Sequence, residues 1–302
     1  MIQTTQPRLA FGCMQFGGPA DATASRAMFE ACLAAGIRHF DTACGYTDGA
    51  SETLLGQFAR GHDLFIATKV GYHGGAGRAN LLAQFDASRK RLQMDSVDLL
   101  YLHRFDPETP LQDTLATFAD LQARGLVRHI GLSNFAAWQV MKAQAIAHGL
   151  GTRIAAIQPM YSLVKRQAEV ELLPMAADQG IAAFTYSPLG AGLLSGKYSQ
   201  GSAGRLTEDS RYATRYAPET MHETARALAD LAAQYQLHPA TLAVAWVMAH
   251  PSHPVPIISA RNVDQLHPSL AAATFALTGE LYARISALSP KPPPATDRLD
   301  EA

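Results

Sequence analysis

Short runs of apolar, β-prone residues alternate along this chain with longer segments in which apolar residues recur at helical spacing. Most of the apolar runs are nearly continuous, which is typical of parallel strands that are buried on both faces. We therefore predict eight strands, at residues 9–14, 37–42, 64–69, 97–103, 127–132, 154–159, 181–186 and 255–259.

The segments between these runs favour helices, which we predict at residues 22–35, 80–92, 111–123, 137–148, 167–179 and 219–235. Three of them are followed shortly before the next strand by a glycine, a common helix stop: Gly36, Gly125 and Gly180. Parallel strands need crossover helices, so eight strands with intervening helices predict a single-domain α/β fold, a (β/α)8 TIM barrel spanning residues 1–289.

A doubly wound sheet would show the same alternation of strands and helices. It usually has fewer strands and a glycine-rich phosphate loop of the form GxGxxG after the first one. The nearest candidate here is GYHGGAG at residues 71–77, which has the wrong glycine spacing. We therefore favour the barrel.

Two segments stand outside the repeating pattern. Residues 189–218, rich in Gly, Ser, Arg and Tyr, interrupt the chain after the seventh strand. At the carboxyl end of a barrel strand such an insertion is expected to close over a ligand, the alternative being surface decoration. The proline-rich, charged tail at residues 290–302 is expected to be disordered.

The charge pattern argues against a nucleic-acid or membrane partner. The chain has 25 basic and 26 acidic side chains, a net charge of −1 and no block of like charge, so neither a nucleic acid nor a membrane surface is expected. We see no secretory signal, no apolar stretch of membrane-spanning length and only three cysteines, without disulfide or metal spacing. A cytoplasmic protein with a small-molecule partner, either a monomer or a homo-oligomer, is the economical interpretation.

Polar residues stand where most of the predicted strands end, and active sites of such barrels lie at that rim. Each has an ordinary explanation when taken alone, for example a turn cap, a snorkelling lysine or a core histidine. Their accumulation at one rim is hard to explain by packing. These residues are Asp41, Lys69, His103, Ser133, Asn134, Gln158, Tyr186 and Ser259.

One further side chain, Tyr46, follows Asp41 by five residues and turns this set into a proton-transfer site. A free phenol has a pKa of about 10. We expect Lys69 to lower that pKa, Asp41 to hold the lysine charged, and a neutral His103 to hydrogen-bond a carbonyl oxygen. The set contains no nucleophile–base pair for acyl transfer and no metal cluster, so a hydride would have to come from a cofactor.

At this point the sequence resembles the aldo-keto reductase superfamily over nearly its whole length. The resemblance rests on FDTACGYTDGASE, ATKVG, SRKRLQMDSVDLLYLHRFDPETP, GLVRHIGLSNF, IQPMYS, FTYSPLGAGLLSGKY and ISARNVDQL, in the family's order. It is strongest to the bacterial branch that also resembles potassium-channel β-subunits. It implies a nicotinamide-dependent oxidoreductase that interconverts carbonyl compounds and alcohols.

The resemblance also implies roles for individual residues. It assigns a catalytic tetrad of Asp41, Tyr46, Lys69 and His103. It places the nicotinamide contacts at Ser133, Asn134, Gln158 and Tyr186. It places the contacts of the pyrophosphate at Ser187, Leu189, Gly190 and Lys197. It places the adenosine end of the cofactor at Ser259, Arg261 and Gln265, where a guanidinium suits a 2′-phosphate and favours NADP(H) over NAD(H).

The chain departs from the family pattern at three places. Cys13-Met14 replaces Thr-Trp beside the substrate pocket, Ile258-Ser259 replaces Pro-Gly, and Pro268-Ser269 replaces Glu-Asn at the adenine. Two other functions stay open beside the reductase: a nicotinamide-binding regulatory subunit with slow turnover, and a cofactor-free lyase or isomerase on the same barrel.

Overall fold

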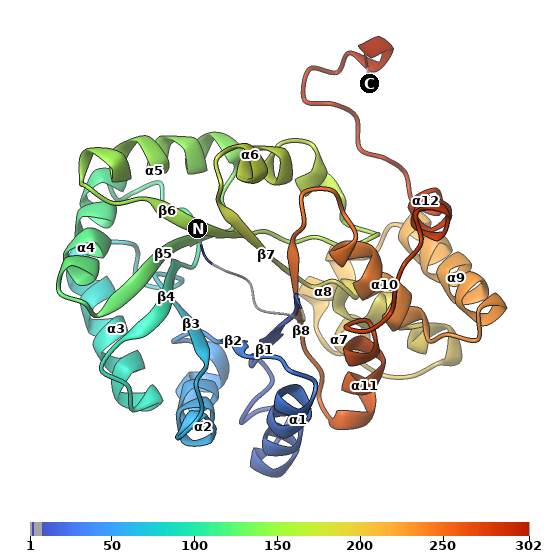
Figure 1. The fold of residues 1–302 in the computed structure, drawn as a ribbon, viewed down its shortest axis with the longest axis horizontal. Coiled ribbons are helices and arrows are strands. Elements are labelled where there is room, and N and C mark those ends of the chain that lie inside the picture. Colours follow the sequence, from blue (N-terminus) through green and yellow to red (C-terminus); the bar gives the residue numbers. More distant parts are fainter. Residues whose placement is uncertain (1, 3–7, 302) are drawn as a thin grey trace.

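The computed structural model describes residues 2 and 8–301. Eight parallel strands close into a barrel in the order of the sequence, and β1 pairs with β8 to complete it (Figure 1). The predicted (β/α)8 barrel is therefore confirmed. The strands are β1 Ala10–Gly12, β2 His39–Asp41, β3 Phe65–Val70, β4 Val97–Leu102, β5 Val127–Ser133, β6 Ile154–Gln158, β7 Ala182–Tyr186 and β8 Val255–Ile258.

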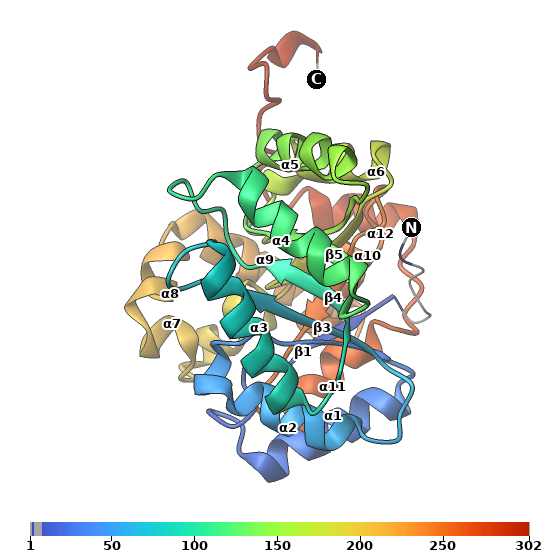
Figure 2. The same cartoon turned by 90° about the vertical axis from the view of Figure 1, so that its left-hand side faces the viewer.

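Helices surround the strands, as Figures 1 and 2 show. The crossover helices of the first six strands are α1 Ala22–Ala34, α2 Ala50–Ala59, α3 Arg78–Leu92, α4 Leu111–Ala123, α5 Ala137–Gly149 and α6 Leu172–Asp178. The later ones are α9 Glu219–Gln234, α10 Pro239–Met248, α11 Val263–Ala271 and α12 Gly279–Ser286. No helix in the described residues is long and apolar enough to cross a membrane.

The helix predicted at residues 167–179 is wrong in its first part. Gln167–Glu169 forms only a 3-10 turn, and α6 begins at Leu172. Pro174 explains the difference, because proline is tolerated only in the first turn of a helix, where its missing N–H is not needed. The turn is held instead by Arg166, whose guanidinium binds both oxygens of Glu169 at 2.9 Å and the carbonyl oxygens of Ser286 and Ser289.

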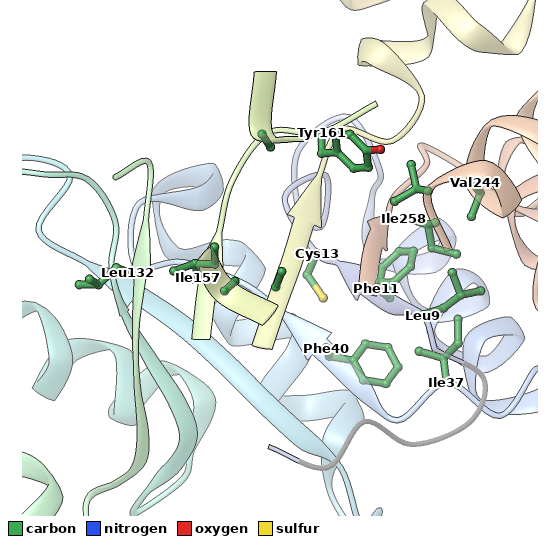
Figure 3. Close-up of a cluster of buried hydrophobic side chains, with 14 of the residues drawn as sticks. Leu9, Phe11, Cys13, Ile37, Phe40, Leu132, Ile157, Tyr161, Val244 and Ile258 are labelled. Atoms are coloured by element: carbon green, nitrogen blue, oxygen red, sulfur yellow. The ribbon is translucent and has the colours of Figure 1, made fainter. Parts of the chain in front are cut away.

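The core consists of two layers. Side chains of alternating strand positions fill the barrel, among them Ala10, Leu99, Tyr101 and Phe184. Gly131 leaves room for the Tyr101 ring, since a Cβ there would lie 2.5 Å from it. The intervening positions form a second layer between strands and helices: Figure 3 shows Leu9, Phe11, Ile37, Phe40 and Ile258 in it.

This alternation determines which polar side chains share the barrel interior. Asp41 pairs in register with Ala67, and Lys69 pairs with Tyr101. Ala67 and Tyr101 both belong to the inner layer. Side chains alternate between the two faces of a strand, and residues paired in register point to the same face. Asp41 and Lys69 therefore point into the barrel interior, at the carboxyl ends of their strands.

The insertion at residues 189–218 folds into short pieces rather than one open loop. Two 3-10 turns, Gly190–Ser195 and Lys197–Gln200, lead into the short helices α7 Arg205–Glu208 and α8 Ser210–Arg215. Leu193, Leu194 and Tyr216 are buried and anchor the insertion. Both views show α7 and α8, in yellow, on the side of the barrel where α9 lies (Figures 1 and 2).

After α12 the chain leaves the body of the molecule as an arm that ends in the 3-10 turn Leu299–Glu301 (Figure 1). The disorder expected for residues 290–302 stays a prediction, and Ala302 lies outside the described residues.

Candidate active site

A buried ion pair lies at the carboxyl ends of β2 and β3. Lys69 Nζ binds Asp41 Oδ1, and the two side chains are 0% and 4% exposed. The same ammonium donates to the carbonyl oxygen of Thr42 at 2.8 Å and to the Tyr46 hydroxyl at 3.4 Å. The structure therefore brings three of the four expected tetrad residues into one hydrogen-bonded chain.

A strained turn positions Tyr46. Thr47 and Asp48 both adopt left-handed backbone conformations, with φ of 47° and 54°. For a residue other than glycine, this conformation costs about 1 kcal/mol or more of conformational free energy. Thr47 Oγ1 offsets this by donating to the carbonyl of Phe16 at 2.7 Å and accepting from the amide of Ser51 at 3.0 Å. The turn is thus held at both ends.

Burial governs the protonation of the phenol. Burial raises the pKa of Tyr46 above its ordinary value, and the opposing effect of Lys69 does not cancel it. Burial alone would lower the pKa of Lys69, but Asp41 and Tyr46 raise it, which keeps the ammonium charged. The expectation of a net lowered Tyr46 pKa is therefore wrong: near neutral pH the residue is a protonated phenol beside a charged lysine.

His103 completes the set from the end of β4. Its ring meets Tyr46 edge-on, with centroids 5.8 Å apart, and Tyr72 packs against it at 4.9 Å. Burial, with smaller effects of Lys69 and Arg104, lowers the pKa of His103 to about 3. The imidazole is therefore neutral, and its buried Nδ1 has no hydrogen-bond partner among the described residues.

A second hydrogen-bonded group lies next to the tetrad. The Gln158 side-chain amide donates to Asp41 Oδ2 at 2.8 Å, and Ser133 Oγ donates to the Gln158 carbonyl at 3.1 Å. Asn134 donates to the backbone oxygen of His103 at 2.9 Å and accepts from the Tyr186 hydroxyl at 2.7 Å. The four residues expected at the nicotinamide thus form one network with the tetrad.

The residues expected at the pyrophosphate cluster where the insertion starts. Ser187 and Gly190 have φ of 60° and 55°, and the Ser187 carbonyl accepts from the Gly190 amide at 2.9 Å. Leu189 packs partly buried against the core. The Lys197 ammonium lies 4.8 Å above the Tyr198 ring.

The residues expected at the adenosine end follow β8. Ser259 Oγ is buried without a partner among the described residues. The Gln265 side chain accepts from the Arg261 backbone amide at 3.3 Å, and this bond links α11 to the loop that precedes it. The Arg261 guanidinium is itself occupied, because it forms an ion pair with Glu208 of the insertion.

Two residues of α7 were missed by the sequence analysis. Glu208 binds Arg261, and the Arg205 guanidinium donates to Gln15 of the loop after β1 when the Gln15 amide oxygen faces it. Arginine is one of the residues that enrich the insertion, but no spacing signal connects Glu208 with a residue 53 positions later.

The described residues contain no group of three or more His, Cys, Asp or Glu side chains that could hold a metal ion. They do fit a nicotinamide dinucleotide. The unpartnered Ser259 Oγ and His103 Nδ1 are buried polar atoms that a ligand or water would satisfy. Lys197, Arg205 and Arg261 supply the cations that phosphates need.

Comparison with known proteins decides the family. The model of the aldo/keto reductase family matches residues 8–290. The chain belongs to this family. An uncharacterized oxidoreductase, YrpG, of Bacillus subtilis (strain 168) is 35% identical over 94% of this chain and 93% of its own length.

Other aldo/keto reductase relatives differ in their described roles. A probable voltage-gated potassium channel subunit beta of Oryza sativa subsp. japonica is 29% identical over 96% of this chain and 95% of its own length. The human aflatoxin B1 aldehyde reductase member 2 is 38% identical over 66% of this chain and 58% of its own. Family membership and these relatives support an oxidoreductase, and the resemblance seen in the sequence is confirmed.

Proposed function

We propose that this protein reduces aldehydes or ketones with NADPH, and oxidises the corresponding alcohols with NADP, using Tyr46 as the general acid and base. One observation carries the proposal: the Tyr46 phenol is hydrogen-bonded to an ammonium whose own counter-ion, Asp41, is buried with it.

Proton transfer follows from this geometry. Tyr46 is protonated near neutrality, so it can donate to a carbonyl oxygen as negative charge develops there. The phenolate that forms lies beside the Lys69 ammonium, which stabilises it and is held by Asp41. In alcohol oxidation the same phenolate accepts the proton.

The neutral His103 orients the substrate. An uncharged imidazole can hydrogen-bond the carbonyl oxygen without releasing a competing proton. Its ring lies roughly perpendicular to that of Tyr46 with the centroids 5.8 Å apart, so we expect both groups to reach the same carbonyl oxygen.

When bound, a nicotinamide dinucleotide supplies the hydride that none of these side chains can provide. Ser133, Asn134 and Gln158 would hold the nicotinamide amide, and Tyr186 would cover its ring. Ser187, Leu189, Gly190 and Lys197 would hold the pyrophosphate under the insertion. Ser259, Arg261 and Gln265 would hold the adenosine end, where the cations favour the 2′-phosphate of NADPH.

We also propose a reduced, cytoplasmic setting. All three cysteines are free, and burial raises the pKa of each thiol, that of Cys44 to about 11. Such thiols are weak nucleophiles and resist oxidation.

The direct test replaces Tyr46 by phenylalanine. Tyr46→Phe should lower kcat by roughly 100-fold or more, the usual contribution of a general acid, while NADPH binding measured by fluorescence is unchanged. Tyr235→Phe, which alters an exposed tyrosine, is the matched control. Full turnover by Tyr46→Phe on every reducible carbonyl of a panel would exclude the assignment.

A second candidate is a nicotinamide-binding regulatory subunit with slow turnover, favoured by the likeness to the rice channel subunit over nearly the full length. Stopped-flow oxidation of bound NADPH separates the two. An enzyme repeats the reaction at a rate comparable to the first turnover, whereas a redox-reporting subunit gives one turnover and then nearly stops.

A further inference from the structure

A carboxylate of the insertion occupies the arginine expected to bind the 2′-phosphate. Arg261 Nη1 donates to Glu208 Oε1 at 3.1 Å, and Nη2 binds Oε2, so the pair is bidentate. The side chains are 29% and 45% exposed, which leaves the pair open to a competing ligand from solvent. Arg261 follows β8 and Glu208 is the last residue of α7, so the contact joins the insertion to the loop after β8.

The surroundings of this pair carry excess positive charge. Lys197 lies close enough to Arg261, Glu208 and Arg205 for their charges to interact, and Tyr198 lies among the same side chains. In the described part of the chain Lys197 and Arg205 form no ion pair of their own, so this group of side chains holds three cations and one carboxylate. A phosphate monoester, with close to two negative charges near neutrality, matches this set better than a single carboxylate does.

We propose that Glu208 is a specificity-determining residue, which holds Arg261 in the cofactor-free protein and must be displaced by the 2′-phosphate of NADPH. The inference rests on the proposed function. The fork of a guanidinium binds a carboxylate or a phosphate in the same bidentate manner, so the two anions exclude each other. NADH lacks the phosphate and leaves the pair intact, and its free ribose hydroxyl can donate to Glu208. Glu208 therefore reduces the preference for NADPH that Arg261 creates.

The geometry of α7 makes the displacement feasible. The segment is held independently of Glu208 by the Leu206 amide, which donates to the Tyr198 hydroxyl at 3.2 Å. Releasing Glu208 therefore does not release the whole helix. The carboxylate can turn away while the bond between Leu206 and Tyr198 keeps α7 in place.

The experiment measures dissociation constants of NADPH, NADH and adenosine 2′,5′-bisphosphate by fluorescence titration of the full chain. Glu208→Gln should tighten NADPH and the bisphosphate about threefold, as expected for a partly exposed ion pair, and leave NADH unchanged or weaker. Asp209→Asn is the matched control: its carboxylate is adjacent but pairs with Arg211, and all three constants should stay the same.

An unchanged or reduced ratio of NADH to NADPH dissociation constants in Glu208→Gln would overturn the inference and leave Glu208 as a strap for α7. Arg261→Ala separates this failure from that of the proposed cofactor. If Arg261→Ala weakens NADPH selectively while Glu208→Gln changes nothing, the NADPH preference stands and the role of Glu208 is refuted. If Arg261→Ala weakens both cofactors equally, the NADPH preference itself is refuted.

Discussion

The Gln158 side-chain amide donates to Asp41 Oδ2 at 2.8 Å, although the two residues lie 117 positions apart in the chain. The other oxygen of Asp41 binds Lys69. Both carboxylate oxygens are therefore engaged, one with the lysine that contacts Tyr46, the proposed proton donor, and one with a residue proposed to hold the nicotinamide. A single buried charge connects the two halves of the site.

Asp41→Asn should destabilise the protein by about 3–5 kcal/mol, because removing one partner leaves a buried, uncompensated ammonium. The pKa of Lys69 should fall, and the lysine should become largely neutral. Urea unfolding measures the loss. Asp86→Asn, which breaks an exposed pair with Arg89, should cost less than about 1 kcal/mol. Equal effects of the two substitutions would show that Lys69 has another counter-ion.

The pH profile of carbonyl reduction should be flat from about pH 6 to pH 9. Burial raises the pKa of Tyr46, so the proton donor is lost only above its ordinary value of 10. Burial lowers the pKa of His103 to about 3, so this group does not titrate in the range either. Alcohol oxidation should instead rise with pH toward the Tyr46 pKa, since it needs the phenolate. Values of kcat/KM, measured from initial rates in both directions across this pH range, test the prediction. An inflection near pH 6.5 in the profile of carbonyl reduction would show that His103 titrates.

Tyr72 should control the protonation of His103. Its ring packs against the imidazole at 4.9 Å and excludes water from that side. In Tyr72→Ala the pKa of His103 should rise from about 3 toward its ordinary value of 6.5, because burial is the main cause of the shift. Reduction should then become pH-dependent below pH 7. Tyr72→Phe keeps the ring and should retain the flat profile, and NMR titration of His103 reports the pKa directly.

Much of the barrel could be predicted because buried parallel strands appear as continuous apolar runs whose ends carry the site. The polar residues Asp41 and Lys69 end two such runs, and the alternation of side chains turns both inward. The start of α6 could not be placed from periodicity alone, because the position of Pro174 decides it. The pattern of apolar residues along the sequence predicts where a strand ends, but it does not predict which residues a loop side chain contacts.

The net pKa of Tyr46 and the partner of Arg261 were beyond the sequence for that reason. The first depends on how completely the phenol is buried, which competes with the neighbouring ammonium. The second depends on how the insertion folds back over the barrel to bring Glu208 to Arg261. Neither the burial of the phenol nor the fold of the insertion is encoded in the spacing or periodicity of residues.

Ser259 should matter to cofactor binding and not to folding. Its Oγ is buried without a partner among the described residues, so Ser259→Ala removes an unsatisfied group and should leave the unfolding free energy unchanged or slightly higher. If this hydroxyl binds the adenosine end, the substitution should weaken NADPH by about 1 kcal/mol, roughly fivefold. Ser88→Ala is the matched control, since that hydroxyl is equally buried and unpartnered but lies in α3. Melting curves with and without NADPH separate the two effects: only Ser259→Ala should lose part of the stabilisation by cofactor. Full retention of that stabilisation would remove Ser259 from the cofactor site.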